Sequence, residues 1–411
     1  MAQLQPVRGT HDLLPQDERR HRAVIDTARQ TAGRYGFERV ETPIFEFTEV
    51  FTRTVGETSD IVSKEMYVFE DRGGESIALR PEGTAGVARA VISNGLAQNL
   101  PLKVFYNGPM FRYERPQKGR QRQFHQIGIE LIGPIQPIAD VEVIACGADI
   151  LDSLGILPRV QLELNTLGDM TSRDAYRAAL VEYFGGFRDQ LSEDSKLRLE
   201  KNPLRILDSK DEGDRKLVVN APTFEQYLSQ KAKDFFGGVT KGLDALGIPY
   251  VLAPRLVRGL DYYTHTCFEF VTTELGAQGT VMAGGRYDGL IRDMGGPDIA
   301  GVGWAAGIER LSMMLGFEPE VARPIVLAPL GEAAEAEALK LAHKLRKAGH
   351  SVDLGFSGNL KKRLMRANKV NAAKVIILGD DELAKGVAAV RDLDSGEQTE
   401  VALSELLAHL G

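Results

Sequence analysis

A twenty-residue stretch, FRYERPQKGRQRQFHQIGIE at 111–130, sets fixed positive charge beside a carboxylate. Five arginine and lysine residues precede Gln126 against one acid, and the stretch ends on Glu130 after an apolar run. Guanidinium groups bind phosphate or carboxylate through paired hydrogen bonds and stay charged at any working pH. This spacing therefore supports the binding of a polyanion next to a small molecule that is cationic or donates hydrogen bonds.

Other glycine-containing segments repeat this pairing of charged side chains with bare backbone. They are LRPEGT at 79–84, RGLDYYTHT at 258–266 and AGGRYDGL at 283–290. One such segment alone is typical of a turn with a solvated arginine. Together, Arg112, Arg258 and Arg310 suit a polyphosphate whose charge rearranges during a reaction. Glu82 and Glu130 suit the cationic or hydrogen-donating partner.

The segment GVGWAAGIER at 301–310 formally fits the G-x-G-x-x-A fingerprint of dinucleotide-binding folds. That fingerprint requires a buried strand before its first glycine, whereas MGGPDIA here is a glycine- and proline-containing loop. A nicotinamide or flavin site is therefore not predicted. Instead, glycine at alternate positions of a strand leaves one face bare enough for a flat ring.

Composition indicates the setting in which this site works. The chain has 411 residues, 43% hydrophobic, with a formal net charge of −7, so a polyanion must be met by local patches rather than by the whole surface. Its two cysteines, Cys146 and Cys267, are far apart and fit a reducing compartment. The N-terminal residues lack a signal-peptide pattern, and no run of 18 apolar residues occurs. We expect a cytoplasmic protein that does not enter a membrane.

The elements that must position these residues read as a sheet-centred α+β unit over 1–323. DERRHRAVIDTARQTAGRYG has helical periodicity, FERVETPIFEF is strand-like, and TCFEFVTTE and GTVMAGG are later strands. Between them, residues from about 168 to 250 are mostly helical and rich in charge, which predicts a helical insertion. This insertion is either a functional addition or a simple surface elaboration.

The pattern changes near residue 323. PIVLAPL, SVDLGF and KVIILG are short apolar strands that alternate with helical stretches, which predicts a small parallel α/β domain over 324–411. Its segment NLKKRLMRANKVNAAK carries six cations and no acid, with Lys362, Arg366 and Lys369 on one helical face. That face is either a binding surface for a polyanion or an ordinary solvated face.

The ordered motifs resemble those of a known family. The strand ending in Pro43, FRYE with its basic loop and Phe124, and GVGWAAGIER resemble the three motifs of class II aminoacyl-tRNA synthetases. RGLDYYTHT and AGGRYDGL resemble signatures of the histidyl-tRNA synthetase family, and the likeness runs from residue 6 to the chain end. It implies an antiparallel-sheet catalytic domain with an insertion, then an anticodon-binding α/β domain. It also implies a homodimer, since the counterpart of FERVETPIFE lies at a two-fold interface.

The resemblance implies a reaction in which L-histidine and ATP give histidyl-adenylate and pyrophosphate, and the histidyl group passes to the 3′ end of tRNA. For histidine, the implied residues are Glu82, Thr84, Arg112, Gln126, Glu130, Arg258, Tyr262 and Tyr263. For ATP, with Mg²⁺, they are Arg112, Glu114, Arg120, Phe124 and Arg310. For tRNA, they are Arg115, Gln117, Lys118, Arg122, Lys362, Arg366 and Lys369. Arg258 and Arg112 would be catalytic, while His125 and His265 receive no role.

Two alternatives stay open at this point. A regulatory relative of the family keeps the fold but serves as a non-catalytic subunit of the first enzyme of histidine biosynthesis. Such relatives typically lose the RGLDYYT signature and the anticodon-binding domain, both of which this sequence retains. An ATP-dependent ligase that uses histidyl-adenylate for another acceptor would leave the basic C-terminal segment unexplained.

Overall fold

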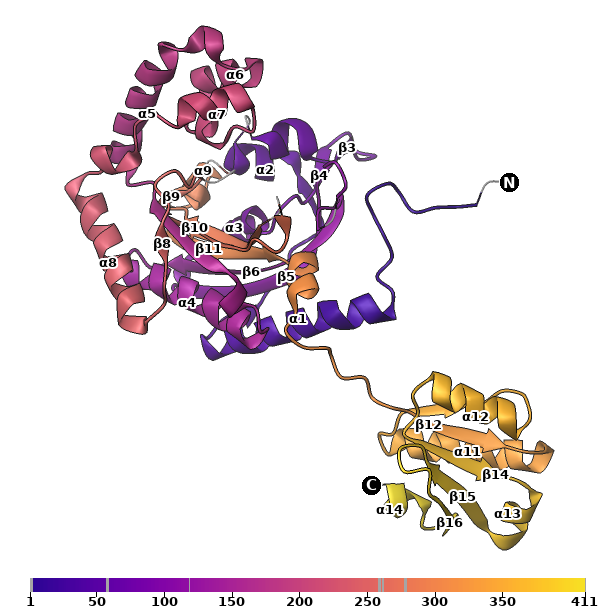
Figure 1. The fold of residues 1–411 in the computed structure, drawn as a ribbon. Helices are drawn as coiled ribbons and strands as arrows, with labels where there is room; N and C mark the ends of the chain where they lie inside the picture. Colours follow the sequence, from indigo (N-terminus) through magenta and orange to yellow (C-terminus); the bar gives the residue numbers. More distant parts are fainter. Residues whose placement is uncertain are drawn as a thin grey trace. The chain divides into compact units, whose positions relative to one another are not determined.

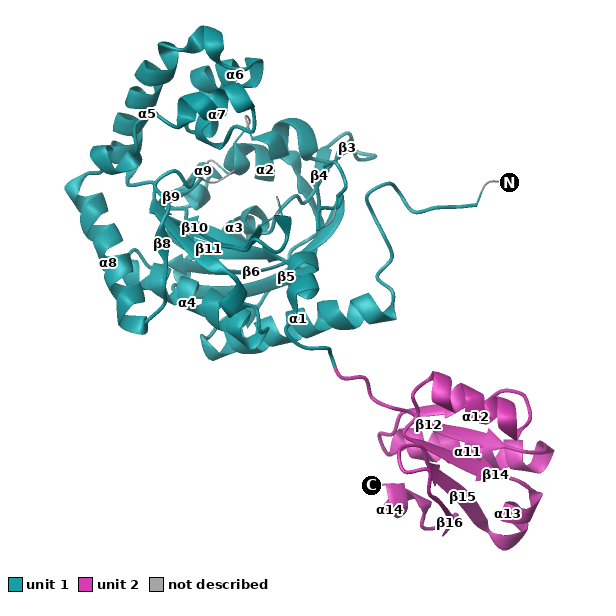
Figure 2. Ribbon diagram, viewed as in Figure 1, with its two compact units in different colours: residues 1–319 teal, residues 320–411 magenta. Residues whose placement is uncertain are grey.

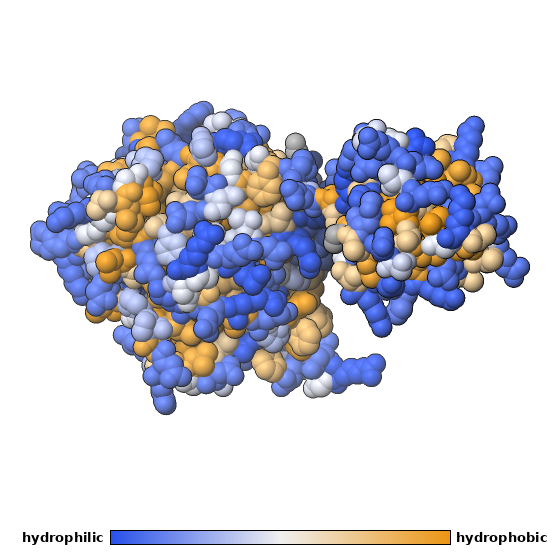
Figure 3. Space-filling view, turned by 90° about the horizontal axis from the view of Figure 1, so that it is seen from below, coloured by the Kyte–Doolittle hydropathy of each residue, from blue (hydrophilic) through white to orange (hydrophobic). Residues whose placement is uncertain are grey.

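The computed structural model describes residues 3–56, 59–117, 119–257, 260, 262–276 and 279–410. The chain divides into two compact units, Met1–Pro319 and Glu320–Gly411 (Figure 2). Within the described ranges, no helix combines the length and apolar character needed to cross a membrane. The face seen in Figure 3 is mainly hydrophilic, with hydrophobic side chains in separate small areas.

An eight-stranded, largely antiparallel sheet forms the centre of unit 1 (Figure 1). In spatial order its strands are β1 (Glu38–Arg39), β5 (Leu102–Phe111), β6 (Gln123–Gly133), β11 (Ala300–Gly307), β10 (Thr280–Arg286), β9 (Thr264–Val271), β7 (Gln161–Thr166) and β8 (Val251–Leu252). The short outer strands β1 and β8 pair in parallel with their neighbours, and the six central strands pair antiparallel. This arrangement confirms the predicted α+β class.

The sequence of β6 assigns its side chains to two faces of the sheet. Ile127, Ile129 and Leu131 join the main hydrophobic core. Because successive side chains of a strand point to opposite faces, Gln126 and Glu130 project from the other face. Strand alternation alone therefore places Gln126 and Glu130 on the same face of β6, away from the core.

Four helices cover the core face of the sheet. They are α1 (Pro15–Arg34), α4 (Pro137–Ser153), α8 (Gln230–Leu246) and α10 (Ile308–Met314). In α1, a proline begins the first turn, acidic residues follow it, and Val24, Ala28 and Ala32 are fully buried at a spacing of four. The opposite face carries α3 (Thr84–Ser93) and the part of the helical insertion that precedes α8, which share a second hydrophobic cluster.

The insertion forms the helical group at the upper left of Figure 1. It comprises α5 (Met170–Gly185), η4 (Arg188–Gln190), α6 (Glu193–Lys201), η5 (Pro203–Asp208), α7 (Glu212–Val218), η6 (Phe224–Tyr227) and α8. Its α-helices begin at side-chain caps, for example Asp169, which accepts from the Ser172 N–H at 2.9 Å. The predicted helical insertion is confirmed.

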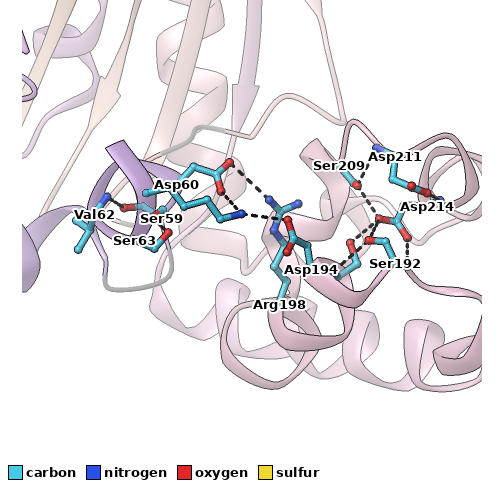
Figure 4. Close-up of polar contacts among 12 residues, drawn as sticks. Ser59, Asp60, Val62, Ser63, Ser192, Asp194, Arg198, Ser209, Asp211 and Asp214 are labelled. Atoms are coloured by element: carbon cyan, nitrogen blue, oxygen red, sulfur yellow. Dashed lines mark hydrogen bonds and ion pairs between the residues drawn. The ribbon is translucent and has the colours of Figure 1, made fainter. Parts of the chain in front are cut away.

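Asp214 is the polar centre of the insertion (Figure 4). It is 0% exposed and accepts hydrogen bonds from the hydroxyls of Ser192 at 2.7 Å and of Ser195 and Ser209 at 2.6 Å each. The Ser192 N–H donates to its other oxygen at 2.9 Å. Burial opposes ionisation of this carboxyl, but the serine donors outweigh burial and lower the pKa of Asp214.

The segment FERVETPIFEF does not form the strand that the sequence predicts. It contains only the two-residue β1 and the three-residue β2 (Phe45–Phe47), with Pro43 between them rather than at a strand end. The Thr42 and Pro43 carbonyls accept from the buried Arg80 guanidinium at 2.9 and 3.4 Å, so a side chain replaces ladder bonds here. A three-stranded sheet follows, in the order β2, β4 (Ser76–Leu79) and β3 (Val68–Glu70), next to α2 (Thr48–Val55) and η1 (Ile61–Glu65).

Unit 2 contains a five-stranded sheet with helices on both faces. Its strands, in spatial order, are β13 (Val352–Leu354), β12 (Ile325–Pro329), β14 (Lys374–Leu378), β15 (Val387–Asp392) and β16 (Gln398–Ala402). Its helices are α11 (Glu332–Lys347), α12 (Leu360–Lys369), α13 (Asp380–Lys385) and α14 (Leu406–Leu410). Alternate residues of β12 enter two hydrophobic clusters, one with α11 and one with α12.

The prediction of a parallel sheet is wrong for the second half of unit 2. The first three strands pair in parallel, but β15 runs antiparallel to β14 and β16 antiparallel to β15. A tight turn closes the last pair, with the Asp392 N–H donating to the Glu397 carbonyl at 2.9 Å. Such a short connection joins only antiparallel strands, because a parallel pair needs a longer crossover.

Candidate active site

The face of the sheet opposite the main core carries a cavity of about 250 Å³, over β6, β10 and β11. All the described residues with a predicted histidine or ATP contact line it: Glu82, Thr84, Arg112, Glu114, Arg120, Phe124, Gln126, Glu130, Tyr262, Tyr263 and Arg310. Arg258, expected at the same site, lies outside the described residues. Residues separated by more than two hundred positions therefore converge on one small volume.

Glu130 lies in the wall of this cavity and is 1% exposed. One carboxylate oxygen accepts from the Thr84 hydroxyl at 2.7 Å, and the other accepts from the Tyr287 hydroxyl at 2.6 Å. Burial raises the pKa of Glu130 to about 8, even though these hydrogen bonds favour its charged form. A cationic ligand would relieve this unfavourable burial of charge.

The glycines of 301–310 make room for this arrangement. Gly303 on β11 pairs with Glu130 on β6, and a Cβ at Gly303 would lie 1.8 Å from the Glu130 carboxylate. At Gly301, a Cβ would lie 2.2 Å from the ring of Tyr287. The face predicted to be bare for a flat ring is thus filled by the chain's own side chains at these two positions. Gly307 lines the cavity, and a Cβ there would meet nothing within 4 Å.

Glu82, like Glu130, accepts a hydrogen bond from Thr84, and it caps the start of α3. Its two oxygens accept from the N–H groups of Thr84 at 2.6 Å and Ala85 at 2.8 Å, where the helix has unpaired donors and a partial positive charge. Burial raises the pKa of Glu82, and the two backbone donors oppose that rise. Gln126 adds a buried Oε1 atom for which the described residues supply no hydrogen-bond donor.

Tyrosines form the rest of this acidic end. The rings of Tyr262 and Tyr263 lie 4.7 Å apart, and Tyr262 meets Tyr287 edge to face at 5.8 Å. Tyr106 fits between Gly83 and Gly128, where an added Cβ would lie 2.3 Å from its ring in either case. Burial raises the pKa of Tyr262 well above its usual value, so its hydroxyl stays protonated and can donate.

Arginines form the opposite end of the cavity. Arg112 donates from Nε to the Pro81 carbonyl at 2.9 Å, and its guanidinium carbon lies 5.3 Å from the centre of the Phe124 ring. Arg310 donates to the Thr280 carbonyl at 2.6 Å. Burial lowers the pKa of Arg310, and the positive charge of Arg120 lowers it further. The positive charges of Arg120 and Arg310 repel each other, which favours an anion bound beside both.

The basic loop after Arg112 is partly held by its own contacts. Arg120 forms an ion pair with Glu114. Arg122 stacks on Tyr113, with the guanidinium carbon 3.8 Å from the ring centre. Arg115 and Gln117 are exposed. Lys118, grouped with them as a tRNA contact, lies outside the described residues.

A second cavity of about 680 Å³ lies between the first one and the insertion, and Arg112, Glu114 and Arg120 line both. Ion pairs connect its two sides (Figure 4). Lys64 of η1 approaches Asp194 of α6 at 3.1 Å, and Asp60 approaches Arg198 at 3.6 Å. The insertion therefore borders the approach to the arginine end of the site.

Arg286 and Tyr287, adjacent in AGGRYDGL, make different kinds of contact in the structure. Arg286 is 0% exposed and ion-paired with the equally buried Asp140, so it holds β10 to α4 and is neither solvated nor directed at a ligand. Tyr287 contacts Glu130 directly, and sequence reasoning missed it, as it missed Gly303. Tyrosine beside arginine in the motif was the available signal for Tyr287, but its target became visible only with the strand register.

The two histidines without a role lie in different places. His125 donates from its backbone N–H to both oxygens of Glu309, at 2.9 and 3.1 Å, and its Nδ1 lies 2.9 Å from the same carboxylate. His265 is buried, has φ 43°, and packs against Phe235 at 4.5 Å between ring centres. His265 does not line the small cavity.

The basic segment of unit 2 forms α12, and Lys362, Arg366 and Lys369 are exposed on it. Arg366 pairs with Asp353 at 2.9 Å, whereas Arg363 is buried and donates to the Gly358 carbonyl at 2.8 Å. Phe356, in the loop before α12, is 84% exposed.

Comparison with known proteins places this geometry in context. The sequence profile of histidyl-tRNA synthetase matches residues 9–172 and 196–311, and that of an anticodon binding domain matches residues 324–410. The histidine–tRNA ligase of Rhodospirillum rubrum is 64% identical over 407 residues, covering 99% of this chain and 98% of the relative. That of Gluconacetobacter diazotrophicus is 58% identical over 410 residues, covering 100% and 99%. The crystal structure of apo S. aureus histidyl-tRNA synthetase is similar with a TM-score of 0.85 at 35% identity, over 99% of each chain.

Proposed function

The chain belongs to the histidyl-tRNA synthetase family, and we propose how its own residues carry out the reaction of that family. It is an ATP-dependent aminoacyl-tRNA ligase that activates L-histidine to histidyl-adenylate with release of pyrophosphate and then transfers histidine to the 3′ end of its tRNA. One observation carries the residue assignments: a single cavity joins buried carboxylates at one end to clustered arginines at the other.

The acidic end is proposed to bind histidine. Glu82 and Thr84 receive the α-amino group at the start of α3, where the carboxylate is already fixed by backbone donors. Glu130, Gln126, Tyr262 and Tyr263 surround the imidazole. A buried carboxylate that faces a ring N–H rejects apolar analogues, because they leave its charge without a donor.

The arginine end is proposed to bind ATP. Phe124 stacks on adenine beside Arg112, with Glu114 near the adenine amino group, and Arg120 and Arg310 receive the β- and γ-phosphates. The mutual repulsion of Arg120 and Arg310 supports this assignment, because bound phosphate would remove it. Glu114 pairs with Arg120 in the free protein, so phosphate binding must replace that ion pair.

Mg²⁺ is proposed to accompany the triphosphate. Glu65 and Glu114 both line the second cavity; burial raises the pKa of Glu65, and the charge of Glu114 raises it further. Paired carboxylate oxygens and phosphates are the ligands that Mg²⁺ prefers. Glu65 would hold the ion through its carboxylate, and the ion would neutralise charge on the phosphate oxygens.

The chemistry that follows is positioning and charge stabilisation. The histidine carboxylate attacks the α-phosphorus in line, and pyrophosphate leaves. The terminal ribose hydroxyl of tRNA then attacks the carbonyl carbon of histidyl-adenylate, and AMP leaves. Arg112 bridges the substrate carboxylate and the α-phosphate, and Arg258 is assigned to the α-phosphate as well. Fixed guanidinium groups stabilise the charge that develops without the protein forming a covalent bond.

Transfer requires contacts to tRNA, which we divide between the two units. Arg115, Gln117, Lys118 and Arg122 are assigned to the acceptor end, and Lys362, Arg366 and Lys369 to the anticodon arm. The exposed ring of Phe356 beside α12 adds a surface on which an unpaired base can stack. Regulatory relatives typically lack the anticodon-binding domain, whereas residues 324–410 match one.

We assign catalysis to residues 1–323 and anticodon binding to residues 324–411. A protein ending at residue 323 should keep adenylate formation, because the cavity residues all precede that point, and should lose most transfer to tRNA. Unchanged aminoacylation after this truncation would contradict the division.

A homodimer in the cytoplasm is the proposed working form. Phe45, Phe47, Val68 and Phe69 on β2 and β3 are each about half exposed, a concentration of apolar surface that favours a protein partner. Sedimentation of the wild type and of Phe45→Asp tests this, with a monomeric wild type as the contrary result. Cys146 and Cys267 are both buried thiols, in keeping with a reducing compartment.

ATP–pyrophosphate exchange, measured with each amino acid in turn, tests the proposed specificity. Histidine should support exchange, and the other amino acids should not. Equal exchange with a second amino acid would overturn the assignment of Glu130 and its neighbours as the imidazole pocket.

A further inference from the structure

Three potential metal ligands meet on the edge of the active site, although no step of the proposed reaction uses them. His21 comes from α1, His125 from β6 and Glu309 from α10. One ligand atom from each lies within 4.8 Å of the other two. They are brought together by the packing of three separate elements, so their meeting does not follow from a local sequence motif.

The spacing of the two imidazoles suits a shared ion. Their ring centres lie 5.5 Å apart, with an angle of 79° between the planes. Two imidazoles on one tetrahedral ion, each with a metal–nitrogen bond of about 2.0–2.1 Å, place their ring centres about 5 Å apart. The His125 Nδ1 and the Glu309 Oε1 are 2.9 Å apart, so they need to separate by only a few tenths of an ångström to become neighbouring ligands.

The surroundings of the three potential ligands also suit a metal ion. His21 is buried, so few water molecules compete with an ion for its imidazole. Both oxygens of Glu309 accept from the backbone N–H of His125, which fixes the carboxylate. Such hydrogen bonds to a ligand are typical of the support around metal sites.

A cavity of about 440 Å³ opens beside the cluster and is lined by His21 and Glu309. His11, Gln16 and Asp17 line the same cavity, so water or a further protein ligand can occupy a fourth position. The cation in this wall, Arg20, is engaged by the Ser312 carbonyl at 2.9 Å and by Glu318. An entry path for a small ion therefore exists.

We propose that His21, His125 and Glu309 form a binding site for one transition-metal ion of the Zn²⁺ class, with two nitrogen ligands, one oxygen ligand and an open fourth position. Imidazole nitrogen favours Zn²⁺, Co²⁺ or Ni²⁺ over Mg²⁺, so this site is separate from any Mg²⁺ carried by ATP. The alternative is a plain His125–Glu309 ion pair with His21 packed beside it.

The test uses the full chain without a histidine tag, freed of metal with a chelator that is then removed. Calorimetric titration with Zn²⁺ should give one ion per chain with a Kd on the order of 1 µM. Co²⁺ should develop the visible absorption of a tetrahedral site. The His21→Gln variant should bind at least about tenfold more weakly, since even loss of a ligand's supporting partner costs that much.

His343→Gln, an exposed histidine on α11, is the matched control and should bind as the wild type does. Pyrophosphate exchange without added Zn²⁺ should be unchanged in His21→Gln, which shows that the variant is folded. X-ray absorption of the Zn²⁺-loaded wild type should show two imidazole ligands. Binding weaker than about 100 µM, equal binding by His21→Gln, or an oxygen-only ligand shell would overturn the proposal.

Discussion

Glu130 on β6 and Asp214 in the insertion are both buried carboxylates, yet their pKa values move in opposite directions. Glu130 is 1% exposed and its pKa rises to about 8, whereas Asp214 is 0% exposed and its pKa falls. Burial opposes the charged form in both places. Accessible area alone therefore does not predict the protonation of a buried acid in this molecule.

The deeper burial of Glu130 and the donors around each carboxylate together explain the difference. Asp214 accepts three serine hydroxyls and one backbone N–H, which together stabilise its negative charge. Glu130 accepts two hydroxyls, and the charge of Glu82 nearby raises its pKa further. A buried carboxylate whose oxygens all accept hydrogen bonds from the protein stabilises the fold. A buried carboxylate with too few donors favours binding of a ligand that brings positive charge or an N–H group.

The strongest test of this comparison removes the carboxyl group of Glu130. We expect Glu130→Gln to lower kcat/KM for histidine in pyrophosphate exchange by about 100-fold, because the amide cannot ionise to pair with the bound substrate. KM for ATP should stay within about threefold, since the arginine end is unchanged. An equal loss of affinity for both substrates would show that Glu130 does not belong to the histidine end.

The counterpart is Asp214→Asn in the insertion. An amide oxygen cannot replace a carboxylate that accepts three hydroxyls, so the free energy of unfolding should fall by about 2–3 kcal/mol. Hydrogen exchange should rise over residues 192–218, while histidine-dependent exchange of pyrophosphate changes little. Glu212→Gln, an exposed neighbour, is the control and should leave stability within about 0.5 kcal/mol.

A pH series separates the two acids further. The pKa of Glu130 is about 8 when folded against about 4.3 when unfolded, so its contribution to stability is present below about pH 4.3 and is lost as pH rises through 8. Glutamine does not titrate. The stability of Glu130→Gln relative to the wild type should therefore increase between pH 6 and 8.5, by on the order of 1 kcal/mol per pH unit at most.

Asp214 provides the opposite sign in the same series. Its folded pKa is lowered, so its contribution is present above the unfolded value and is lost only as pH falls through the folded one. The difference between Asp214→Asn and the wild type should stay constant over pH 6 to 8.5. Urea unfolding at each pH measures both differences, and parallel curves for the two variants would contradict the comparison.

The smallest effect is expected at an exposed acid. Asp194 pairs with Lys64 at 3.1 Å, and both side chains are more than half exposed. We expect Asp194→Asn to change the free energy of unfolding by less than about 1 kcal/mol, and by less still at high salt, because water and ions screen such pairs. A loss as large as that of Asp214→Asn would mean that hydrogen-bond saturation is not the deciding factor.

Much of the architecture could be predicted from the sequence, because local patterns carry it. The amphipathic spacing of α1 and the apolar strands of unit 2 were recognisable before any contact was known. The segment FERVETPIFEF was predicted less well. The buried Arg80 donates hydrogen bonds to the Thr42 and Pro43 carbonyls, and a side chain from outside the segment leaves no signal within it.

The candidate site shows the same limit at the level of single residues. Motif resemblance assigned Glu130 and Thr84, and they form a hydrogen bond. It did not assign Tyr287 or Gly303, because their importance depends on which strand lies beside β6 and in which register. Likewise, no sequence pattern indicated that Arg286 is buried against Asp140, which lies far away in the chain.

An added Cβ at Gly303 would lie 1.8 Å from the Glu130 carboxylate, and this limits the substitutions that the protein can accept. Positions 130 and 303 are paired on adjacent strands, so a change at one affects what the other can accept. A Cβ at 303 would also lie 2.4 Å from the Ile129 carbonyl, so a shorter residue at 130 does not by itself make room for a side chain there. A glycine with no chemistry of its own is therefore a precondition for the carboxylate that it faces.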